Sequence, residues 1–171
     1  MDKRLVLLAP DDNCVVVAQS LPAGAKVEID GAGFAVGSRY PRPSVATFGT
    51  HDLLPLQGWW AAHAGDSEGA AMAAAVKLDA QRARVPAERS AAVHAFLGQS
   101  ESAIAVAQYD DLAGETMPVN VPGTTTEHPN WRRRTARTVG AVFEAPEGAR
   151  GIEAIAAGRK PPTELSPTPK G

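Results

Sequence analysis

The sequence predicts an α/β fold built on a parallel sheet. Two short apolar runs, Ser44–Gly49 and Ala103–Gln108, have the length and composition of buried strands. Alanine-rich stretches with few helix-breaking residues lie between them. A strand, helices and a second strand in this order form a βαβ unit. The two strands of such a unit run parallel because the helical crossover returns the chain to the same end of the sheet.

The composition is that of one ordinary globular domain with a core of small side chains. Of the 171 residues, 44% are hydrophobic but only 5% are aromatic, so each buried side chain removes little area from water. The net charge of −2 gives no field that would attract nucleic acid or an anionic membrane. Cys14 is the only cysteine, which excludes an internal disulfide and fits a reducing compartment. We therefore expect a cytoplasmic protein with no nucleic-acid or membrane partner.

Residues 1–36 are predicted to form a small β-rich segment. Cys14–Ala18 is a β-branched run, and Lys26–Ile29 alternates polar and apolar residues with period two. Turn-forming residues separate these runs, at Pro10–Asn13 and Leu21–Gly24. We expect three or four short strands here.

Two helices are expected between the strands of the parallel sheet. Glu68–Arg84 has few helix breakers, and Asp66 or Ser67 can cap its first turn. Pro86 suits the first position of a second helix, which continues through Glu88–Leu97.

The connecting and terminal segments are less regular. Leu53–Trp60 contains a proline and a glycine and is predicted to be an apolar loop. Val139–Ala157 is a weak helical stretch interrupted around Pro146–Gly148. Residues 160–171 are proline-rich and polar, a composition that predicts disorder.

Polar residues follow both strands of the predicted parallel sheet. Thr50-His51-Asp52 ends the first, and Tyr109-Asp110-Asp111 ends the second. The run Val119–Arg134 (VNVPGTTTEHPNWRRR) then combines a Pro-Gly turn, a carboxylate, a histidine, an indole and three guanidiniums. Such mixed chemistry in one loop is typical of a binding site, although the composition also fits a solvated basic turn before a helix. Asp52 is the strongest catalytic candidate, and its alternative role is to cap the turn after the strand.

Two of these segments resemble a known family. VNVPGTTTEHPNWRRR is similar to the C-terminal part of the 4-α-glucanotransferases (amylomaltases, glycoside hydrolase family 77), and Tyr40–Trp60 (YPRPSVATFGTHDLLPLQGWW) is similar to that family's strand and loop around a Thr-His-Asp triplet. The resemblance covers roughly residues 37–159. It implies a partial (β/α)8-barrel segment of about two β/α units, preceded by the small β-rich segment 1–36 and followed by the tail 160–171.

The resemblance also implies roles for individual residues. Asp52 corresponds to the carboxylate that stabilises the oxocarbenium-like transition state, and His51 to a residue that contacts the sugar. Asn130 and Trp131 correspond to substrate-binding residues, whereas Thr126 stands where many members have Asp. The family's nucleophile and acid/base carboxylates have no counterpart in the matched segments, and retaining transfer needs both. We therefore expect an α-1,4-glucan or maltodextrin as ligand, and a truncated or chimeric chain that is inactive alone.

A second resemblance concerns the first 36 residues. LVLLAPDDNCVVVAQSLPAGAKVEIDG is similar to part of the SAF (β-clip) domain of altronate-dehydratase-type proteins. It implies the alternative that the chain is a non-catalytic binding or interaction module. A generic β-meander fits the same residues equally well.

Metal ions and cofactors are not expected. The four histidines lack the paired spacing of a zinc site, and no carboxylate run has the spacing of a Ca²⁺ loop. Gly31-Ala32-Gly33 lacks the third glycine of a dinucleotide fingerprint. The expected protein partner is a chain that supplies the missing barrel strands, or a second copy, because two isolated strands leave unpaired edges.

Overall fold

The computed structural model describes residues 5–6, 16–17 and 37–159 of a chain that separates into two compact units, residues 1–34 and 35–171. In the first unit β1 (Leu5–Val6) pairs antiparallel with β2 (Val16–Val17). The rest of the β-clip-like segment lies outside the described residues, as does the predicted disordered tail 160–171. Both therefore remain predictions.

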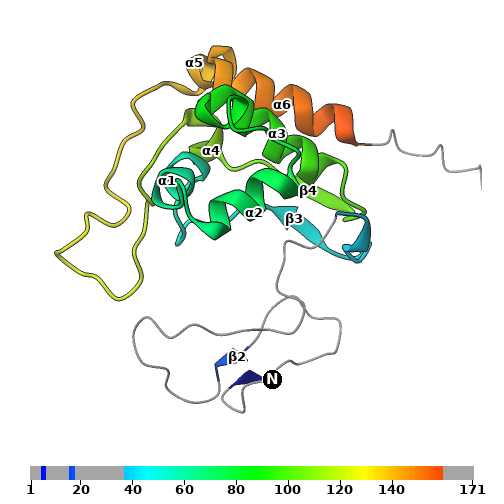
Figure 1. The fold of residues 1–171 in the computed structure, drawn as a ribbon. Helices are drawn as coiled ribbons and strands as arrows, with labels where there is room; N and C mark the ends of the chain where they lie inside the picture. Colours follow the sequence, from blue (N-terminus) through cyan, green and yellow to red (C-terminus); the bar gives the residue numbers. More distant parts are fainter. Residues whose placement is uncertain (1–4, 7–15, 18–36, 160–171) are drawn as a thin grey trace, which may run out of the picture. The chain divides into compact units, whose positions relative to one another are not determined.

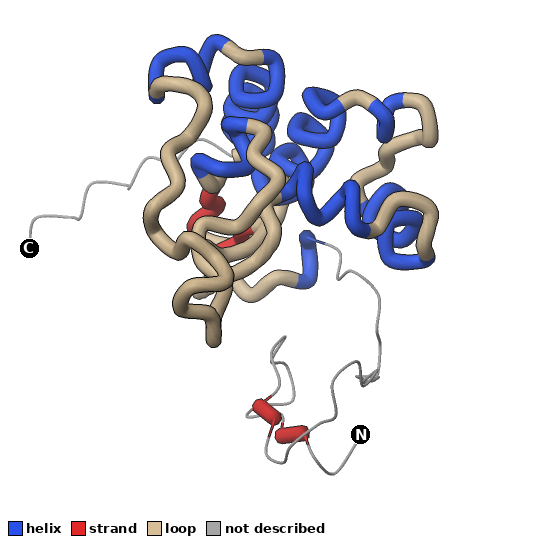
Figure 2. Tube along the Cα trace, turned by 90° about the vertical axis from the view of Figure 1, so that its left-hand side faces the viewer, coloured by secondary structure: helices blue, strands red, loops and turns tan. Residues whose placement is uncertain are grey.

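Residues 37–159 form a mixed α/β unit. Its elements are η1 (Gly37–Arg39), β3 (Val45–Thr47), α1 (Leu56–Ala62), α2 (Ser67–Ala75), η2 (Arg82–Arg84), α3 (Pro86–Gly98), β4 (Ile104–Val106), α4 (Tyr109–Ala113), α5 (Val139–Glu144) and α6 (Pro146–Gly158). Figure 1 shows α3 and α6 side by side, next to the β3–β4 pair. A long loop, residues 114–138, joins α4 to α5 (Figure 2).

The two predicted parallel strands are confirmed. β3 pairs with β4 in parallel, with Val45 opposite Ile104 and Thr47 opposite Val106. Only one face of this pair is covered: Ala46 is buried in the core, whereas Val45 and Ile104 are 56% and 55% exposed. An aliphatic sheet face therefore lies open among the described residues.

Helix α1 corrects the prediction of an apolar loop over Leu53–Trp60. The helix begins at Leu56, directly after Pro55, and its first backbone N–H donates to the buried Asp111 carboxylate at 2.7 Å. Gly58 lies within this helix, and a Cβ at its position would overlap the carbonyl of Thr116. Close approach to the 114–138 loop, rather than flexibility, explains this glycine. Trp60 is buried in the core.

Helix α2 is shorter than the predicted Glu68–Arg84. Asp66 caps its start as expected, accepting from the N–H of Gly69 at 2.8 Å. The helix ends at Ala75 because Lys77 takes a left-handed backbone (φ 55°) and Leu78 donates back to the carbonyl of Ala73. This Schellman end is directed by the burial of Leu78, a tertiary preference that overrides the helical propensity of the alanines.

Helix α3 confirms the predicted start at Pro86, and α6 packs along it. Backbone contact between them is close, because a Cβ at Gly98 would overlap the carbonyl of Ile155. The buried core cluster of this unit consists of Ala46, Leu56, Trp60, Met72, Leu78, Val93 and Leu97.

The segment after β4 is a short helix rather than the predicted end of a strand. Helix α4 places Asp110 and Asp111 in its first turn, where carboxylates interact favourably with the helix dipole, and it ends at Gly114 with φ 73°. The predicted interruption near Pro146 is confirmed, since α5 ends at Glu144 and α6 begins at Pro146. Among the described residues, no helix has the length and hydrophobicity needed to cross a bilayer.

Candidate functional site

The candidate site begins at Asp52, in the turn after β3. The turn is closed by the N–H of Leu53, which donates to the carbonyl of Thr50 at 3.1 Å. One carboxylate oxygen of Asp52, Oδ1, accepts a hydrogen bond from the side-chain amide of Asn120 at 2.6 Å. The same oxygen lies 3.3 Å from Nε2 of His51. Two groups thus fix the orientation of one half-buried carboxylate.

His51 connects this turn to the 114–138 loop. Its carbonyl accepts from the backbone N–H of Asn120 at 3.3 Å, so Asn120 contacts the turn through both backbone and side chain. The His51 ring lies 5.1 Å from the indole ring of Trp131, centroid to centroid, at a tilt of 48°. His51, Asp52 and Trp131 are therefore neighbours.

Trp131 has an unusual backbone. Its φ of 60° lies in the left-handed region, which is strained for a large side chain, and its N–H donates to the carbonyl of Val119 at 3.0 Å. The residue is 63% exposed beside His51. The loop thus holds a large aromatic surface in water.

Asn130 is used inside the loop. Its Oδ1 accepts from the N–H of Val121 at 2.8 Å, and its Nδ2 donates to the carbonyl and hydroxyl of Thr124 at 3.0 and 2.9 Å. These bonds span the turn at Gly123, whose φ is 82°. The amide of Asn130 therefore shapes the turn that precedes Trp131, and one lone pair of its oxygen is left for a further hydrogen bond.

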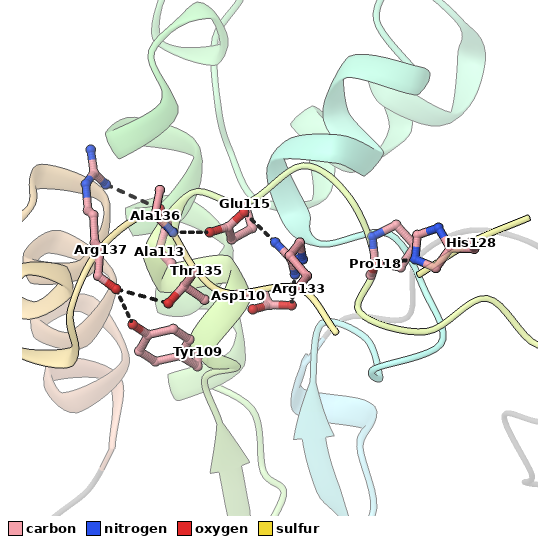
Figure 3. Close-up of polar contacts among 10 residues, drawn as sticks. All are labelled: Tyr109, Asp110, Ala113, Glu115, Pro118, His128, Arg133, Thr135, Ala136 and Arg137. Carbon is pink, nitrogen blue, oxygen red and sulfur yellow. Dashed lines mark hydrogen bonds and ion pairs between the residues drawn. The ribbon is translucent and has the colours of Figure 1, made fainter. Parts of the chain in front are cut away.

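Arg133 anchors the loop to α4, and Figure 3 shows this contact. One guanidinium nitrogen donates to Asp110 at 2.7 Å and another donates to Glu115, with all three side chains mostly buried. A planar guanidinium suits such a forked contact with two carboxylates. Further along, Arg137 donates to the carbonyl of Ala113 at 3.2 Å, also drawn in Figure 3.

The remaining polar residues of the loop also make internal contacts. His128 Nε2 donates to the carbonyl of Pro118 at 3.1 Å (Figure 3). Glu127 accepts from the backbone N–H groups of Thr125 and Thr126, and these hydrogen bonds lower the pKa of its carboxyl. Of the three consecutive arginines, Arg132 and Arg134 are exposed.

Asp111 is the most perturbed carboxyl near the site. It is 1% exposed, and burial raises its pKa to about 6, although the hydrogen bond from the Leu56 N–H acts in the opposite direction. The neighbouring charge of Asp110 raises the pKa further. Asp111 thus connects the start of α1 to the first turn of α4.

Two residues of this arrangement are absent from the sequence-based candidates, Asn120 and Arg133. Their roles depend on contacts with the β3 turn and with α4, which no local pattern reveals. Both residues lie in the Val119–Arg134 run, which is the one local signal for them. Within residues 37–159 no group of three or more His, Cys, Asp or Glu side chains is placed to hold a metal ion.

The parallel pair β3–β4 with its helices makes this unit an α/β protein. Its candidate site lies at the carboxyl ends of the strands, which is where (β/α)8 enzymes carry their active sites. The chain belongs to the 4-alpha-glucanotransferase family, glycoside hydrolase family 77, because the family model matches residues 25–138, two thirds of its length. The match thus begins within the segment assigned above to a β-clip-like unit. The resemblance of residues 1–36 to a SAF (β-clip) domain stays a prediction.

Individual relatives agree with this assignment. A curated 4-alpha-glucanotransferase of Haemophilus influenzae is 26% identical over 139 residues, covering 62% of this chain and 20% of the relative. The crystal structure of amylomaltase from Corynebacterium glutamicum superposes with a TM-score of 0.58 at 21% identity, over 72% of this chain and 23% of that structure. The structural match supports the fold. The chain spans about a fifth of the length of the curated relative it matches.

Proposed function

We propose that residues 37–159 contribute two β/α units to the (β/α)8 barrel of a 4-α-glucanotransferase, which transfers α-1,4-glucan segments between maltodextrins. The observation that carries this proposal is the convergence of Asp52, His51 and Trp131 at the carboxyl end of β3. A carboxylate, an imidazole and an exposed indole within one small surface suit a sugar ring, which has hydroxyl groups at its rim and apolar C–H faces.

Asp52 stabilises the transition state in this proposal. The sugar ring acquires positive charge as the glycosidic bond breaks, and a carboxylate held nearby interacts with that charge more strongly than with the neutral ground state. The hydrogen bond from Asn120 holds Asp52 in place before the reaction, so that no reorganisation is needed at the moment of charge development. Asn120 is therefore a positioning residue.

The substrate contacts come from the neighbouring side chains. His51 donates a hydrogen bond to a glucan hydroxyl, and the exposed Trp131 indole covers one apolar face of a ring. Asn130 acts on the ligand through the remaining lone pair of Oδ1 and through the loop shape that it maintains.

The remaining chemistry is proposed to come from other strands. Retaining transfer needs a nucleophile and an acid/base carboxylate about 5–5.5 Å apart. Near Asp52, the Asp110 carboxylate is paired with Arg133, and Asp111 is buried as the cap of α1. We propose that the two reacting carboxylates lie on strands that pair with the free edges of β3 and β4 and cover the aliphatic face of this sheet.

A binding experiment tests the site. Maltotriose titrated into the ¹⁵N-labelled 171-residue chain should shift the Trp131 indole N–H and the backbone amides of residues 50–53 and 119–131. An affinity of about 1 mM is expected, because only one wall of the cleft contacts the sugar. Trp131→Ala should abolish the response. The matched control is Phe143→Ala, which removes an exposed aromatic side chain from α5 and should leave the response intact. Absence of shifts at saturating maltotriose would contradict the proposal.

An activity measurement tests the missing carboxylates. The chain alone should release no glucose from maltotriose, because loss of groups that act as a unit removes many powers of ten in rate. Glucose release that Asp52→Asn abolishes would show that a carboxylate of this chain serves as the nucleophile, and the proposal would then be wrong on this point.

A further inference from the structure

Helix α1 begins shortly after the Asp52 turn and is capped from a distant part of the chain. Its N-cap residue is Pro55, whose ring has no polar group that could accept from the first N–H groups of the helix. The N–H of Leu56 donates instead to Oδ1 of Asp111 at 2.7 Å, across 55 positions of sequence. Only Leu53–Pro55 lies between Asp52 and this hydrogen bond. The end of the Asp52 turn is therefore held by a carboxylate of α4.

Both partners of this hydrogen bond are fixed in the fold. Leu56 is fully buried in the core, and Asp111 is 1% exposed in the first turn of α4. Its neighbour Asp110 is paired with Arg133, which keeps the same turn of α4 in place. Pro55 has a restricted backbone, so a displacement of Leu56 is passed on to the turn. The turn thus depends on β3 at one end and on Asp111 at the other.

Side chains do not fill the space between this turn and α4. A pocket of about 240 Å³ lies there. It is lined from both sides, by the turn residues Thr50, His51 and Leu53 and by the α4 residues Tyr109, Asp110 and Asp111. Tight packing is what normally restrains a buried segment, and on this side of the turn it is incomplete. The hydrogen bond between Asp111 and Leu56 therefore contributes more to the position of the turn.

The strength of this hydrogen bond depends on the charge of Asp111. An ionised carboxylate accepts a backbone N–H more strongly than a neutral carboxyl group does. Burial raises the pKa of Asp111 to about 6, while the Leu56 hydrogen bond lowers it and the charge of Asp110 raises it further. Below pH 6 the neutral carboxyl holds the Leu56 N–H less tightly, although loss of the buried charge favours the folded chain as a whole.

The titratable and charged groups on the elements around Asp111 are few. Helix α1 has none, and those of α4, the β3 turn, the 114–138 loop, α5 and α6 that lie on this side are Tyr109, Asp110, His51, Arg133, Glu144 and Glu147. Asp110 and Glu147 are paired with arginines, and Glu144 is exposed. His51 is replaced in the first experiment below, so that its titration does not mix with that of Asp111.

We propose that Asp111 is a positioning residue: its ionised carboxylate holds the start of α1 and with it the Asp52 turn, and its protonation loosens the turn and weakens glucan binding. The identity of the ligand rests on the proposed function. The link between Asp111 and the turn does not rest on it and can be measured without a ligand. Asp111 itself touches no sugar, because its carboxyl group is buried.

The first test follows the ligand-free chain by NMR. When the ¹⁵N-labelled full chain carrying His51→Gln is titrated from pH 7.5 to pH 5, the Leu56 amide should shift with a midpoint of about 6. The backbone amides of residues 50–53 and the Asn120 side-chain NH₂ should shift with the same midpoint. Adding Asp111→Asn should remove the transition from all of these signals. A Leu56 transition with silent turn signals overturns the proposal, and so does the absence of a transition at Leu56.

The second test measures the affinity of the full chain for maltotriose at pH 7.5 and pH 5. At pH 7.5 Asp111→Asn should bind about threefold more weakly than the unaltered chain, because Asn is a neutral acceptor. At pH 5 the two proteins should bind alike, since Asp111 is then neutral as well. A merely structural role of Asp111 would lower the affinity of the variant by the same factor at both pH values.

Two control variants separate this effect from general changes in capping and charge. Asp66→Asn makes the same substitution at the cap of α2, where the carboxylate accepts from the Gly69 N–H at 2.8 Å. Glu153→Gln removes an exposed carboxyl group from α6. Both variants should bind maltotriose like the unaltered chain at each pH.

The remaining outcomes are equally decisive. Equal affinities of Asp111→Asn and the unaltered chain at pH 7.5 overturn the proposal, as does a ratio of affinities that does not change with pH. If Asp111→Asn fails to fold, the titration of the His51→Gln chain decides alone. Absence of maltotriose binding by every protein contradicts the proposed function, whereas the ligand-free titration still decides whether Asp111 positions the turn.

Discussion

At the scale of single residues, the candidate site is held by contacts between distant segments. Asp52 receives its hydrogen bond from Asn120, 68 positions further along the chain, and Arg133 joins the 114–138 loop to α4. Charge-assisted hydrogen bonds between partly buried groups contribute more than surface ion pairs, because water competes less with them. These residues should therefore affect both the stability and the geometry of the site.

Replacement of Arg133 tests this expectation. Arg133→Ala leaves Asp110 and Glu115 partly buried without their cation, so we expect the free energy of unfolding to fall by about 2 kcal/mol. The neighbouring Arg132 is exposed, and Arg132→Ala should change it by less than about 0.5 kcal/mol. Urea unfolding of both variants measures the difference. Equal stability of the two variants would show that the contact of Arg133 with Asp110 and Glu115 contributes nothing to the stability of the fold.

The raised pKa of Asp111 makes the free energy of unfolding depend on pH. Its folded pKa, about 6, exceeds the usual 3.8, so the folded chain binds this proton more tightly than the unfolded chain does. The stabilisation is complete below pH 3.8 and is lost as the pH rises through 6. His94 acts in the opposite direction, because burial lowers its pKa and the unfolded chain then binds that proton more tightly below pH 6.5.

Comparing the chain with its Asp111→Asn variant isolates the contribution of the Asp111 carboxyl to the pH dependence of stability, because the contribution of His94 is the same in both proteins. From pH 5 to pH 7.5 the unaltered chain should lose about 1 kcal/mol of unfolding free energy relative to the variant. Urea unfolding at the two pH values measures this, with Glu153→Gln as the control. A difference that does not change with pH would contradict the raised pKa.

At the scale of elements, much of the fold can be predicted from local patterns, and the exceptions have physical causes. The β-branched and small apolar runs identify β3 and β4, and proline marks the starts of α3 and α6. Helix α1 is not evident from the sequence, because its start depends on a carboxylate 55 positions away in the chain. The end of α2 is equally hidden, since the burial of Leu78 stops an alanine run that favours further helix.

The same limit applies to the candidate site. A motif can suggest His51, Asp52 and Trp131 as candidates, because their residue types suit contacts with a polar ligand. It cannot identify Asn120 as the partner of Asp52, or show that the amide of Asn130 spans a turn, because both follow from how the 114–138 loop lies against the rest of the chain.

The α3–α6 packing gives a prediction at this scale. Gly98→Ala places a methyl group against the carbonyl of Ile155 in α6. Because α6 cannot move away without losing its packing against α3, we expect the free energy of unfolding to fall by about 2 kcal/mol or more. Gly140→Ala makes the same change in α5 where nothing lies within 4 Å, and it should stabilise the chain by about 0.5 kcal/mol. Thermal unfolding compares the two. A neutral Gly98→Ala would show that the helices can separate freely.

At the scale of the whole molecule, the open sheet face is the main liability. Val45, Ile104 and Val106 present an aliphatic surface next to two free strand edges, a combination that favours association. We expect the isolated chain to self-associate at micromolar to millimolar concentrations. Ile104→Lys should reduce this, whereas Val139→Lys, at an equally exposed position on α5, should not. Sedimentation velocity measures the change. A monomer at all concentrations, or equal effects of both variants, would contradict this role for the sheet.

The parallel pairing of β3 with β4 also has a kinetic consequence. Strand β3 cannot pair until α2, α3 and the chain up to Ile104 have been synthesised, so it stays unpaired during most of the synthesis of this unit. Such non-local contacts slow folding, because the entropy of closing a long loop is lost before the contacts form. The Asp52–Asn120 hydrogen bond spans an even longer separation. The proposed glucan site should therefore be among the last parts of this unit to form, after local elements such as α3.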